Sequence, residues 1–205
     1  PIYLNTIQSY QKGLSQRNAL LKNMGEHRLF DLESIEVWDK QMVKLGVLIH
    51  EKRKSFLSSF IPVFQNFYHK IGDENEQVSI DYKSQLNNED FAKLLIEYHK
   101  KDSYAQYSNV GTHKDDLIFN ITDYPIKKFG SQGQQKSFII ALRLAQFDWL
   151  KVQKKTNPIL LLDDIFDKLD AKRVQKLVTL VTQDYFGQVM VSDTDEDRMK
   201  ALLNS

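Results

Sequence analysis

An unbroken apolar run at residues 159–162, followed directly by Asp163 and Asp164, constrains the fold more than any other feature of this sequence. Four apolar residues without alternation fit a strand that is covered on both faces, as in a parallel sheet. Around this run the pattern predicts helices over 131–151 and 171–181, a short strand over 189–191, and a closing helix from about residue 195. Strands that alternate with helices predict an α/β fold with a mostly parallel sheet.

Residues 1–71 predict a different architecture. Apolar and aromatic side chains recur at steps of three and four over residues 3–21, with Arg17 in the one polar slot, and again over 35–71. This is the spacing of helices that pack along a partner, and Asp31 is a candidate N-cap for the second helix. We expect an antiparallel helical hairpin, with a kink or a restart of the second helix near residues 58–62 because of Pro62.

The middle of the chain carries weaker signals. Residues 77–83 alternate in the manner of a half-buried strand, residues 88–99 carry a helical stripe, and residues 117–121 form a second strand candidate after the turn-like Asn109-Val110-Gly111. We therefore divide the chain into a helical hairpin lobe over 1–71 and an α/β part over 72–205.

Composition excludes several classes of protein. With 27% charged and 41% hydrophobic residues the chain is globular, and it contains no apolar stretch that could span a membrane and no signal-peptide pattern, so we expect a cytoplasmic protein. The absence of cysteine excludes disulfides, thiolate zinc sites and cysteine nucleophiles. The net charge of +1 gives no sign of a dense basic surface. Because the first residue is Pro1, the sequence suggests a piece of something longer.

The acid pair after the apolar run is the first candidate for chemistry, because parallel strands deliver functional groups at their carboxyl ends. An apolar quartet followed by two acids is the Walker B layout, in which Asp163 would hold Mg²⁺ through water and Asp164 would orient or deprotonate an attacking water. The alternative is a strand that simply ends in two solvated acids. A receiver-like phosphoacceptor is disfavoured, because its acid pair follows a first strand and here other elements precede it.

Residues 130–137 miss the phosphate-loop pattern G-x-x-x-x-G-K-[ST] by one position, where Gln135 replaces the second glycine. We reject this segment as a Walker A motif, because that glycine lets the loop curl around phosphates. The segment fits a helix start better: Ser131 is a good N-cap and Gln134 completes a capping box. Such a helix end can bind phosphate, although a cap that serves only the helix is the alternative.

These residues resemble a family. Ser131-Gln132-Gly133-Gln134 resembles the signature motif of ABC-type ATPases, although Gly130 stands where leucine is usual and Gln132 where a glycine is usual. Residues 159–164 and Asp167-Lys168-Leu169-Asp170 resemble their Walker B motif and D-loop. Together with residues 111–116 and with Gln16-Arg17-Asn18, these motifs are similar to the RecF family of bacterial DNA replication and repair proteins.

The resemblance implies a partial ABC-ATPase head, with an incomplete, mostly parallel sheet and covering helices, plus an α-helical lobe built on the hairpin. Residues 72–205 would be the signature and Walker B part of the head, and the family's amino-terminal lobe with Walker A is absent here. The family is a slow ATPase and an ATP-dependent dimer. It binds DNA at junctions of single and double strand and, with the RecO and RecR proteins, promotes recombinase loading at gaps. It has no membrane partner.

The resemblance also implies roles for individual residues, with ATP and Mg²⁺ held between two subunits. Asp163 would serve the metal and Asp164 the attacking water. The nucleotide-binding set would be Ser131, Gly133, Gln134, Lys136, Asp167 and Asp170, of which the first two contact the γ-phosphate and the last two lie across the dimer. Asp164 stands where most ABC ATPases have glutamate, so we expect slow hydrolysis. Without a Walker A, we expect this chain alone neither to bind ATP tightly nor to hydrolyse it.

Other candidates are weaker. Asp193 or Thr194 could sense the γ-phosphate, where transporters of this class carry a switch histidine. His113, Asp115 and Asp116 fit a turn better than a metal site, and the resemblance would put them near the nucleotide or the lobe junction. The basic clusters at residues 52–54 and 127–128 are candidate contacts for DNA phosphates, or solvated faces. The competing hypothesis for the whole chain is a non-catalytic module that docks protein or DNA and carries relic ATPase motifs.

Overall fold

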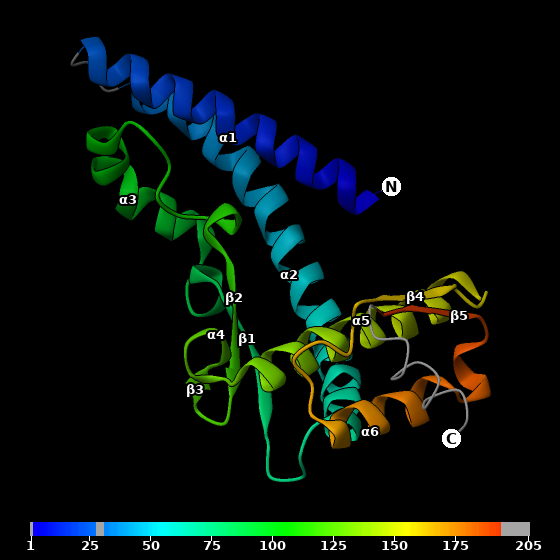
Figure 1. The fold of residues 1–205 in the computed structure, drawn as a ribbon. Helices are drawn as coiled ribbons and strands as arrows, with labels where there is room; N and C mark the ends of the chain where they lie inside the picture. Colours follow the sequence, from blue (N-terminus) through cyan, green and yellow to red (C-terminus); the bar gives the residue numbers. More distant parts are fainter. Residues whose placement is uncertain (1, 28–30, 194–205) are drawn as a thin grey trace. The chain divides into compact units, whose positions relative to one another are not determined.

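The computed structural model describes residues 2–27 and 31–193 (Figure 1). Its helices and strands are, in order, α1 Ile2–His27, α2 Leu32–Ile71, β1 Val78–Lys83, α3 Phe91–Ala105, β2 Asp116–Ile121, β3 Tyr124–Pro125, α4 Ile126–Phe129, α5 Gln132–Lys154, β4 Leu160–Asp163, α6 Ala171–Val181 and β5 Val189–Ser192. Short 3₁₀ turns occur at Gln85–Asn87, Thr112–Lys114 and Asp184–Phe186. The predicted closing helix lies outside the described residues.

The chain forms two compact units that are interleaved along the sequence. One unit contains Pro1–Leu57 and Tyr82–Leu117, and the other contains Ser58–Asp81 and Ile118–Ser205. The chain passes from one to the other within α2, within β1 and within β2. The division of the chain into a helical hairpin lobe over 1–71 and an α/β part over 72–205 stays a prediction.

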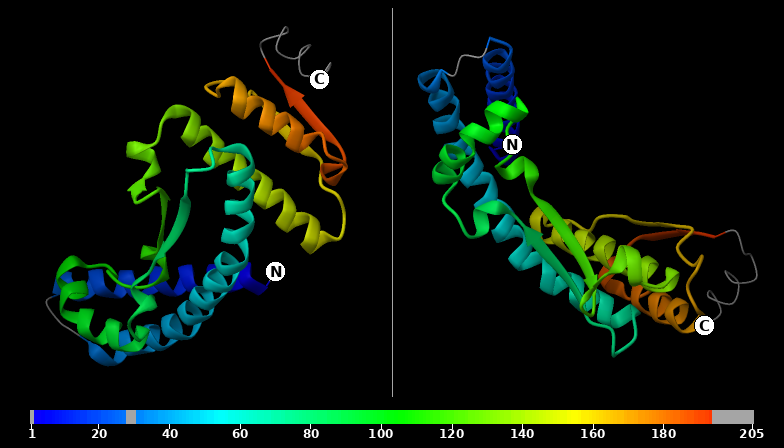
Figure 2. Two further views of the ribbon diagram at one scale, coloured as in Figure 1. Left: turned by 90° about the horizontal axis from the view of Figure 1, so that it is seen from below. Right: turned by 90° about the vertical axis from the view of Figure 1, so that its left-hand side faces the viewer.

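The first unit contains the predicted antiparallel hairpin. Met24 shares a cluster with Ile35, and Tyr10 shares another with Met42, so that contacts move forward along α2 as they move back along α1. Both views of Figure 2 show α1 running beside the first part of α2. The hairpin prediction is therefore confirmed, and α3 packs against it through Phe91, Leu94 and Leu95.

The polar slot in the stripe of α1 is a buried ion pair. The Arg17 side chain is fully buried, and its Nε donates to Asp39 at 2.6 Å while Nη1 donates to Asp102 at 2.6 Å and to Ser108 at 2.8 Å. The neighbouring Asn18 accepts the backbone N–H of Ser108 at 2.8 Å. Arg17 therefore ties α1 to α2, α3 and the loop after α3, which gives the 16–18 motif a structural role.

α2 does not restart at Pro62. It is one helix from Leu32 to Ile71 with Pro62 inside it, so the predicted restart is wrong, whereas the predicted kink stays a prediction. A proline in a helix interior removes one backbone hydrogen bond. The loss is tolerated in a segment where Phe64, Phe67 and Tyr68 are buried within the following two turns.

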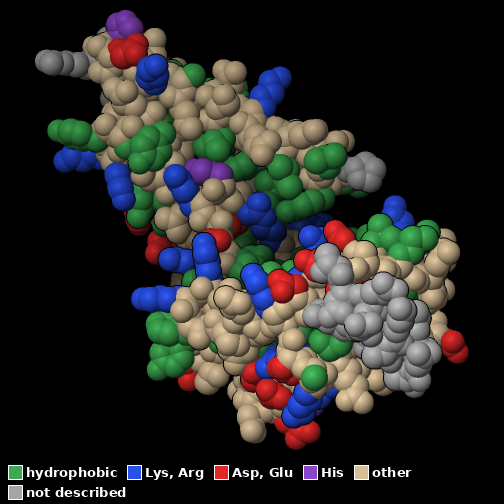
Figure 3. Space-filling model, in the orientation of Figure 1, with side chains coloured by type: hydrophobic (Ala, Val, Ile, Leu, Met, Phe, Trp, Pro, Cys, Tyr) green, Lys and Arg blue, Asp and Glu red, His purple; other side chains and the backbone are tan. Residues whose placement is uncertain are grey.

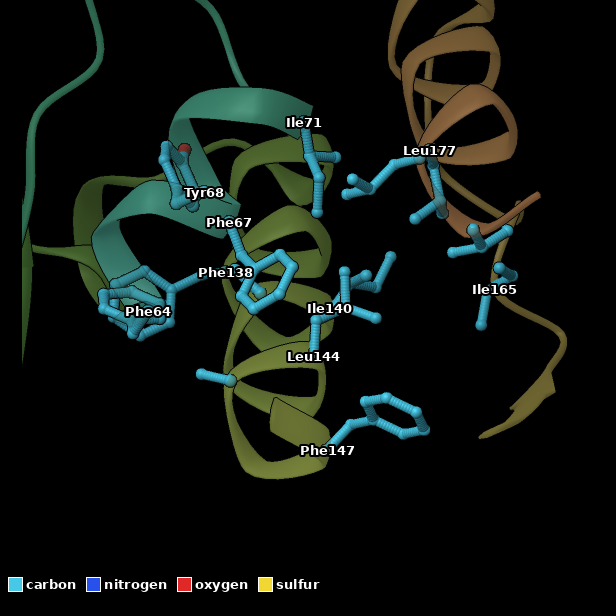
Figure 4. Packing of buried hydrophobic residues seen from close by; sticks show 14 of the residues in the cluster. Phe64, Phe67, Tyr68, Ile71, Phe138, Ile140, Leu144, Phe147, Ile165 and Leu177 are labelled. Atoms are coloured by element: carbon cyan, nitrogen blue, oxygen red, sulfur yellow. The ribbon is translucent and has the colours of Figure 1, made fainter. Parts of the chain in front are cut away.

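The core of the second unit is built by the end of α2 together with α5, α6 and β4. Phe64, Tyr68 and Phe138 form an aromatic contact in which the ring centroids of Phe64 and Phe138 are 4.6 Å apart. Figure 4 shows these rings on one side of α5, with Leu177 of α6 on the other side and Leu144 between them. The predicted helices 131–151 and 171–181 are confirmed as α5 and α6.

Two sheets are present in the described part of the chain. One has the order β1-β2-β3, and β3 pairs antiparallel to β2 with Ile121 opposite Tyr124. The other is the parallel pair of β4 and β5, with Leu160 opposite Val189 and Asp163 opposite Ser192. The predicted parallel arrangement of these two runs is confirmed, and both strands end at the same edge.

The parallel pair is covered on one face only. Leu160 and Leu162 are buried, whereas Leu161 is 68% exposed and Met190 is 54% exposed. Within residues 2–27 and 31–193, therefore, one face of this strand lacks the cover that the unbroken apolar run predicts. No helix in residues 2–27 or 31–193 is long and apolar enough to cross a membrane.

Candidate functional site

The start of α5 has the predicted capping box. Ser131 has extended backbone geometry, and its Oγ accepts the N–H of Gln134 at 3.2 Å while the Gln134 Oε1 accepts the N–H of Ser131 at 2.8 Å. The N–H groups of Gln132 and Gly133 have no carbonyl to bond within the helix, because they lie in its first turn. Ser131 and Gln132 are exposed, so this tip presents backbone donors and the positive end of the helix dipole to its surroundings.

Two glycines at this tip lie in close contacts, and the contact at Gly130 excludes a side chain. A Cβ on Gly130 would lie 2.7 Å from the carbonyl oxygen of Ile126, so the leucine that is usual there in ABC ATPases has no room. A Cβ on Gly133 would lie 3.3 Å from the carbonyl oxygen of Lys168, which belongs to the turn between β4 and α6. Gly133 therefore lets the D-loop-like turn approach the helix tip.

The acid pair lies at the carboxyl end of β4, as predicted. Asp163 is the last residue of the strand, and its Oδ1 accepts a hydrogen bond from the hydroxyl of Ser192 on β5. Asp164 adopts a left-handed backbone conformation with φ of 46°, and its N–H donates to the carbonyl of Ser192 at 3.2 Å. Both carboxylates are exposed, so they are available to a ligand at this edge.

The turn after the acid pair leads directly into α6. Lys168 is also left-handed, with φ of 66°, and Asp170 is the N-cap of α6 through the N–H of Arg173 at 2.9 Å. That hydrogen bond lowers the pKa of Asp170, although burial opposes it slightly. Asp167 is exposed. Residues other than glycine rarely adopt this conformation, and those that do are concentrated at functional turns. Asp164 and Lys168 both adopt it within five positions, which fits a functional turn.

The start of α5 and the residues that follow β4 are in contact. The Lys136 Nζ donates to the carbonyl oxygen of Asp164 at 2.8 Å, and the backbone of Lys168 passes beside Gly133. The start of α5 offers free helix N–H groups, a serine hydroxyl and a lysine, and the neighbouring end of β4 offers two exposed carboxylates. This set of groups can bind phosphate oxygens at the helix tip and a hard cation at the acids.

The residues fit a magnesium ion that is completed by other ligands. No group of three or more His, Cys, Asp or Glu suited to a metal exists within residues 2–27 and 31–193. Mg²⁺ is usually bound by one or two carboxylates, with water and substrate phosphates as the other ligands. Asp163 with its neighbour Asp164 supplies that number, so the site fits Mg²⁺ only in the presence of a phosphate ligand.

Residues 113–116 do not form a cluster. His113 contacts the Tyr10 hydroxyl through Nδ1 at 3.1 Å, and burial lowers the pKa of its ring. Asp115 instead accepts from Arg53 at 2.5 Å and from the Tyr82 hydroxyl, both through Oδ2, whereas its buried Oδ1 has no hydrogen-bond partner among the described residues. These residues belong to the first unit, whereas Ser131 and Asp163 belong to the second.

Sequence reasoning missed three residues of the site. Ser192 follows the apolar residues of β5 and bonds Asp163, and the parallel register that pairs the two strand ends was the available signal. Glu76 and Arg173 contact the capping residue Gln134 and the N-cap Asp170, respectively. They carry no motif, so their role depends on the fold. Of the two residues considered as γ-phosphate sensors, Thr194 lies outside the described residues.

A helix tip with a signature-like sequence, an acid pair at the end of a parallel strand, and a tight turn into the next helix together define part of an ABC-type ATPase head, here joined to a helical lobe. No protein-family model matches the chain. A solved structure described as the recombination mediator RecF with ATP, of the RecFOR pathway, superposes with a TM-score of 0.79 at 25% identity over 95% of this chain.

Curated relatives give the particular family. The chain is 48% identical over 99% of its length to the DNA replication and repair protein RecF of Flavobacterium johnsoniae, and 46% identical over 98% of its length to that of Phocaeicola vulgatus. The protein of the same name from Cytophaga hutchinsonii is 40% identical over 100% of the chain. The chain belongs to the RecF family. It spans 56%, 54% and 54% of these relatives, about half of their length.

Proposed function

We propose that this chain contributes the signature, Walker B and D-loop elements of a RecF-type DNA replication and repair protein that dimerises around ATP and Mg²⁺. The observation that carries the proposal is the contact of Lys136 with the carbonyl of Asp164, which joins the helix tip to the acid pair. The names of the curated relatives and the RecF–ATP structure support the same function.

In this proposal the helix tip binds the γ-phosphate of a nucleotide that the opposing subunit cradles. Ser131 offers its hydroxyl, and Gly133 offers a backbone N–H of the first helical turn. Gln134 keeps the tip in shape through the capping box, and Lys136 adds positive charge on the next turn. Asp167 and Asp170 would face the partner subunit from the turn before α6.

The acid pair would serve the metal and the water. Asp163 would hold Mg²⁺, whose chemistry is to neutralise charge on the phosphates, and Ser192 fixes one oxygen of that carboxylate. Asp164 would orient or deprotonate the attacking water from its left-handed position at the strand end. An aspartate is one methylene shorter than the usual glutamate, so we expect slow turnover that suits a switch.

The proposal also includes specific binding partners of the full-length protein, namely DNA at junctions of single and double strand and the RecO and RecR proteins. Lys52 and Lys54 are exposed on α2, and Lys127 and Lys128 are exposed on α4, so these lysines could contact phosphates. Arg53 is committed to Asp115 and to the carbonyl of Thr112, and it is a weaker candidate.

The test compares two substitutions at one position in the full-length protein. Ser131→Asp and Ser131→Asn both keep a residue that caps helices well, but only aspartate adds a negative charge at the proposed γ-phosphate contact. We expect Ser131→Asp to abolish ATP-dependent dimerisation in light scattering and Ser131→Asn to preserve most of it. Equal dimerisation of both variants and the wild type would favour the non-catalytic docking module instead.

A further inference from the structure

We propose that the ion pair of Glu76 and Arg173 is a positioning bridge, which holds the capped tip of α5 and the turn before α6 in the relative geometry that ATP-dependent dimerisation needs. The inference rests on the proposed function, which it deepens. Neither residue would touch the nucleotide, because each acts through another residue: Glu76 through Gln134, and Arg173 through Asp170.

The first link is the carboxamide of Gln134, which makes two contacts. Its Oε1 accepts the Ser131 N–H at 2.8 Å, and its Nε2 donates to the Glu76 Oε1 at 2.8 Å. The oxygen thus closes the capping box while the nitrogen is held from outside the helix. Glu76 therefore fixes the orientation of the group that shapes the tip.

The second link is the carboxylate of Glu76, which lies in the loop between α2 and β1. Its Oε1 also accepts from the Arg173 Nη2 at 2.7 Å, and its Oε2 accepts from the Tyr68 hydroxyl at 2.9 Å and from the Asp73 N–H at 3.2 Å. Both oxygens are in use, and the side chain is only 13% exposed. Glu76 is therefore held by the protein on both sides and is not a solvated surface acid.

The third link is the guanidinium of Arg173, whose side chain is 6% exposed. It donates to the N-cap Asp170 through Nε at 3.2 Å and to Ser137 of α5 through Nη1 at 3.1 Å, while Nη2 bonds Glu76. A planar fork of donors can hold these three directions at once, whereas a lysine cannot. Arg173 thus connects the turn before α6, the body of α5 and Glu76, which in turn holds Gln134 at the tip of α5.

The surroundings separate this bridge from ordinary surface pairs. Figure 3 shows side chains of both charges gathered over the loop after α2 and the start of α6. Lys172 lies in the first turn of α6 with its side chain 71% exposed, and it pairs with Asp73 at 3.3 Å, an acid that Arg173 also contacts at 3.1 Å. An exposed pair of this kind contributes little to either stability or geometry. Lys172 therefore provides a matched control on the same helix.

The decisive variant is Gln134→Glu in the full-length protein. Glutamate at this position still completes a capping box with Ser131, but it cannot donate to Glu76 and instead faces it with a like charge. Glu76→Gln tests the middle of the bridge, because an amide has one acceptor oxygen where the carboxylate has two, so it cannot accept from Gln134, Arg173 and Tyr68 together. Arg173→Lys tests the other end of the bridge.

The readout is the ATP concentration that gives half-maximal dimerisation, measured by light scattering well below the melting temperature of each variant. We expect Gln134→Glu, Glu76→Gln and Arg173→Lys each to raise it about tenfold, and Lys172→Met to match the wild type. A purely structural role would lower the melting temperature and leave the ATP concentration unchanged. That result would overturn the bridge alone. A wild-type protein without an ATP-dependent dimer would overturn the proposed function as well.

Discussion

The Lys136 Nζ donates a hydrogen bond to the backbone carbonyl oxygen of Asp164 over 2.8 Å. The lysine lies in the second turn of α5, and the carbonyl belongs to a residue in left-handed conformation at the end of β4. The contact therefore fixes the direction of the peptide that follows the candidate catalytic acid. It also couples two motifs that lie 28 positions apart in the sequence.

This contact predicts an effect of Lys136→Met on hydrolysis. The substitution keeps most of the side-chain length but removes the donor, and a hydrogen bond from a charged group contributes about 1.5–3 kcal/mol at most in favourable surroundings. Because Lys136 is partly exposed, we expect a loss of roughly three- to tenfold in the turnover of ATP by the full-length protein. Lys136→Arg retains a donor and is the control. Equal losses of turnover in Lys136→Met and Lys136→Arg would show that the effect of the lysine does not depend on this hydrogen bond.

Because Asp164 has a left-handed backbone conformation, we expect two substitutions of this residue to differ in their effect on stability. Asparagine adopts this region nearly as well as aspartate, whereas alanine adopts it at a cost of about 1 kcal/mol. We expect Asp164→Asn to lower hydrolysis by at least a hundredfold at unchanged stability, and Asp164→Ala to lower both. Hydrolysis assays combined with thermal unfolding check this. Full activity in Asp164→Asn would remove this residue from the proposed chemistry.

Glu76 predicts a pH dependence of stability. Burial alone would raise its pKa, but hydrogen bonds from Arg173, Gln134 and Asp73 outweigh burial and lower the pKa to about 2. An acid with a lowered pKa stabilises the fold above its unfolded value, here 4.5, and loses that contribution as the pH falls toward 2. The wild type should therefore exceed Glu76→Gln in free energy of unfolding at pH 7, and the difference should shrink between pH 4.5 and 2.5. Urea titrations at several pH values measure it, and a difference that does not change with pH would contradict the assignment.

The ion pair of Arg17 predicts a large loss of stability. Arg17→Met removes a buried charge and leaves Asp39 and Asp102 without their shared partner, which typically costs about 3–5 kcal/mol. Chemical denaturation of the full-length protein measures the loss. The control is Lys40→Met, because Lys40 forms only an exposed pair with Glu36 and its loss should cost less than about 1 kcal/mol. Comparable effects of the two substitutions would refute the role of the buried pair.

The sequence predicted those parts of the site that depend on local physics. The capping box of Ser131 and Gln134 follows from residue type and spacing alone, and so do the strand before Asp163 and the helix after Asp170. Each of these features is decided within a few residues of the chain.

The remaining features depend on partners that are distant in sequence. Arg17 was expected to fill a polar slot, but Asp102, 85 positions away, makes it a buried ion pair. Glu76 and Arg173 are 97 positions apart, and neither belongs to a pattern. Local spacing also could not show that only one face of β4 is covered, because coverage depends on what packs against Leu161.

The interleaved course of the chain has a practical consequence for dissecting this protein. Since α2, β1 and β2 each pass from one unit to the other, no single cut separates the units, and each contains two stretches of sequence. Truncation at any one residue between 58 and 117 would therefore leave at least one unit incomplete. Deletion mapping across this region would lose several properties at once, whereas point substitutions can assign them individually.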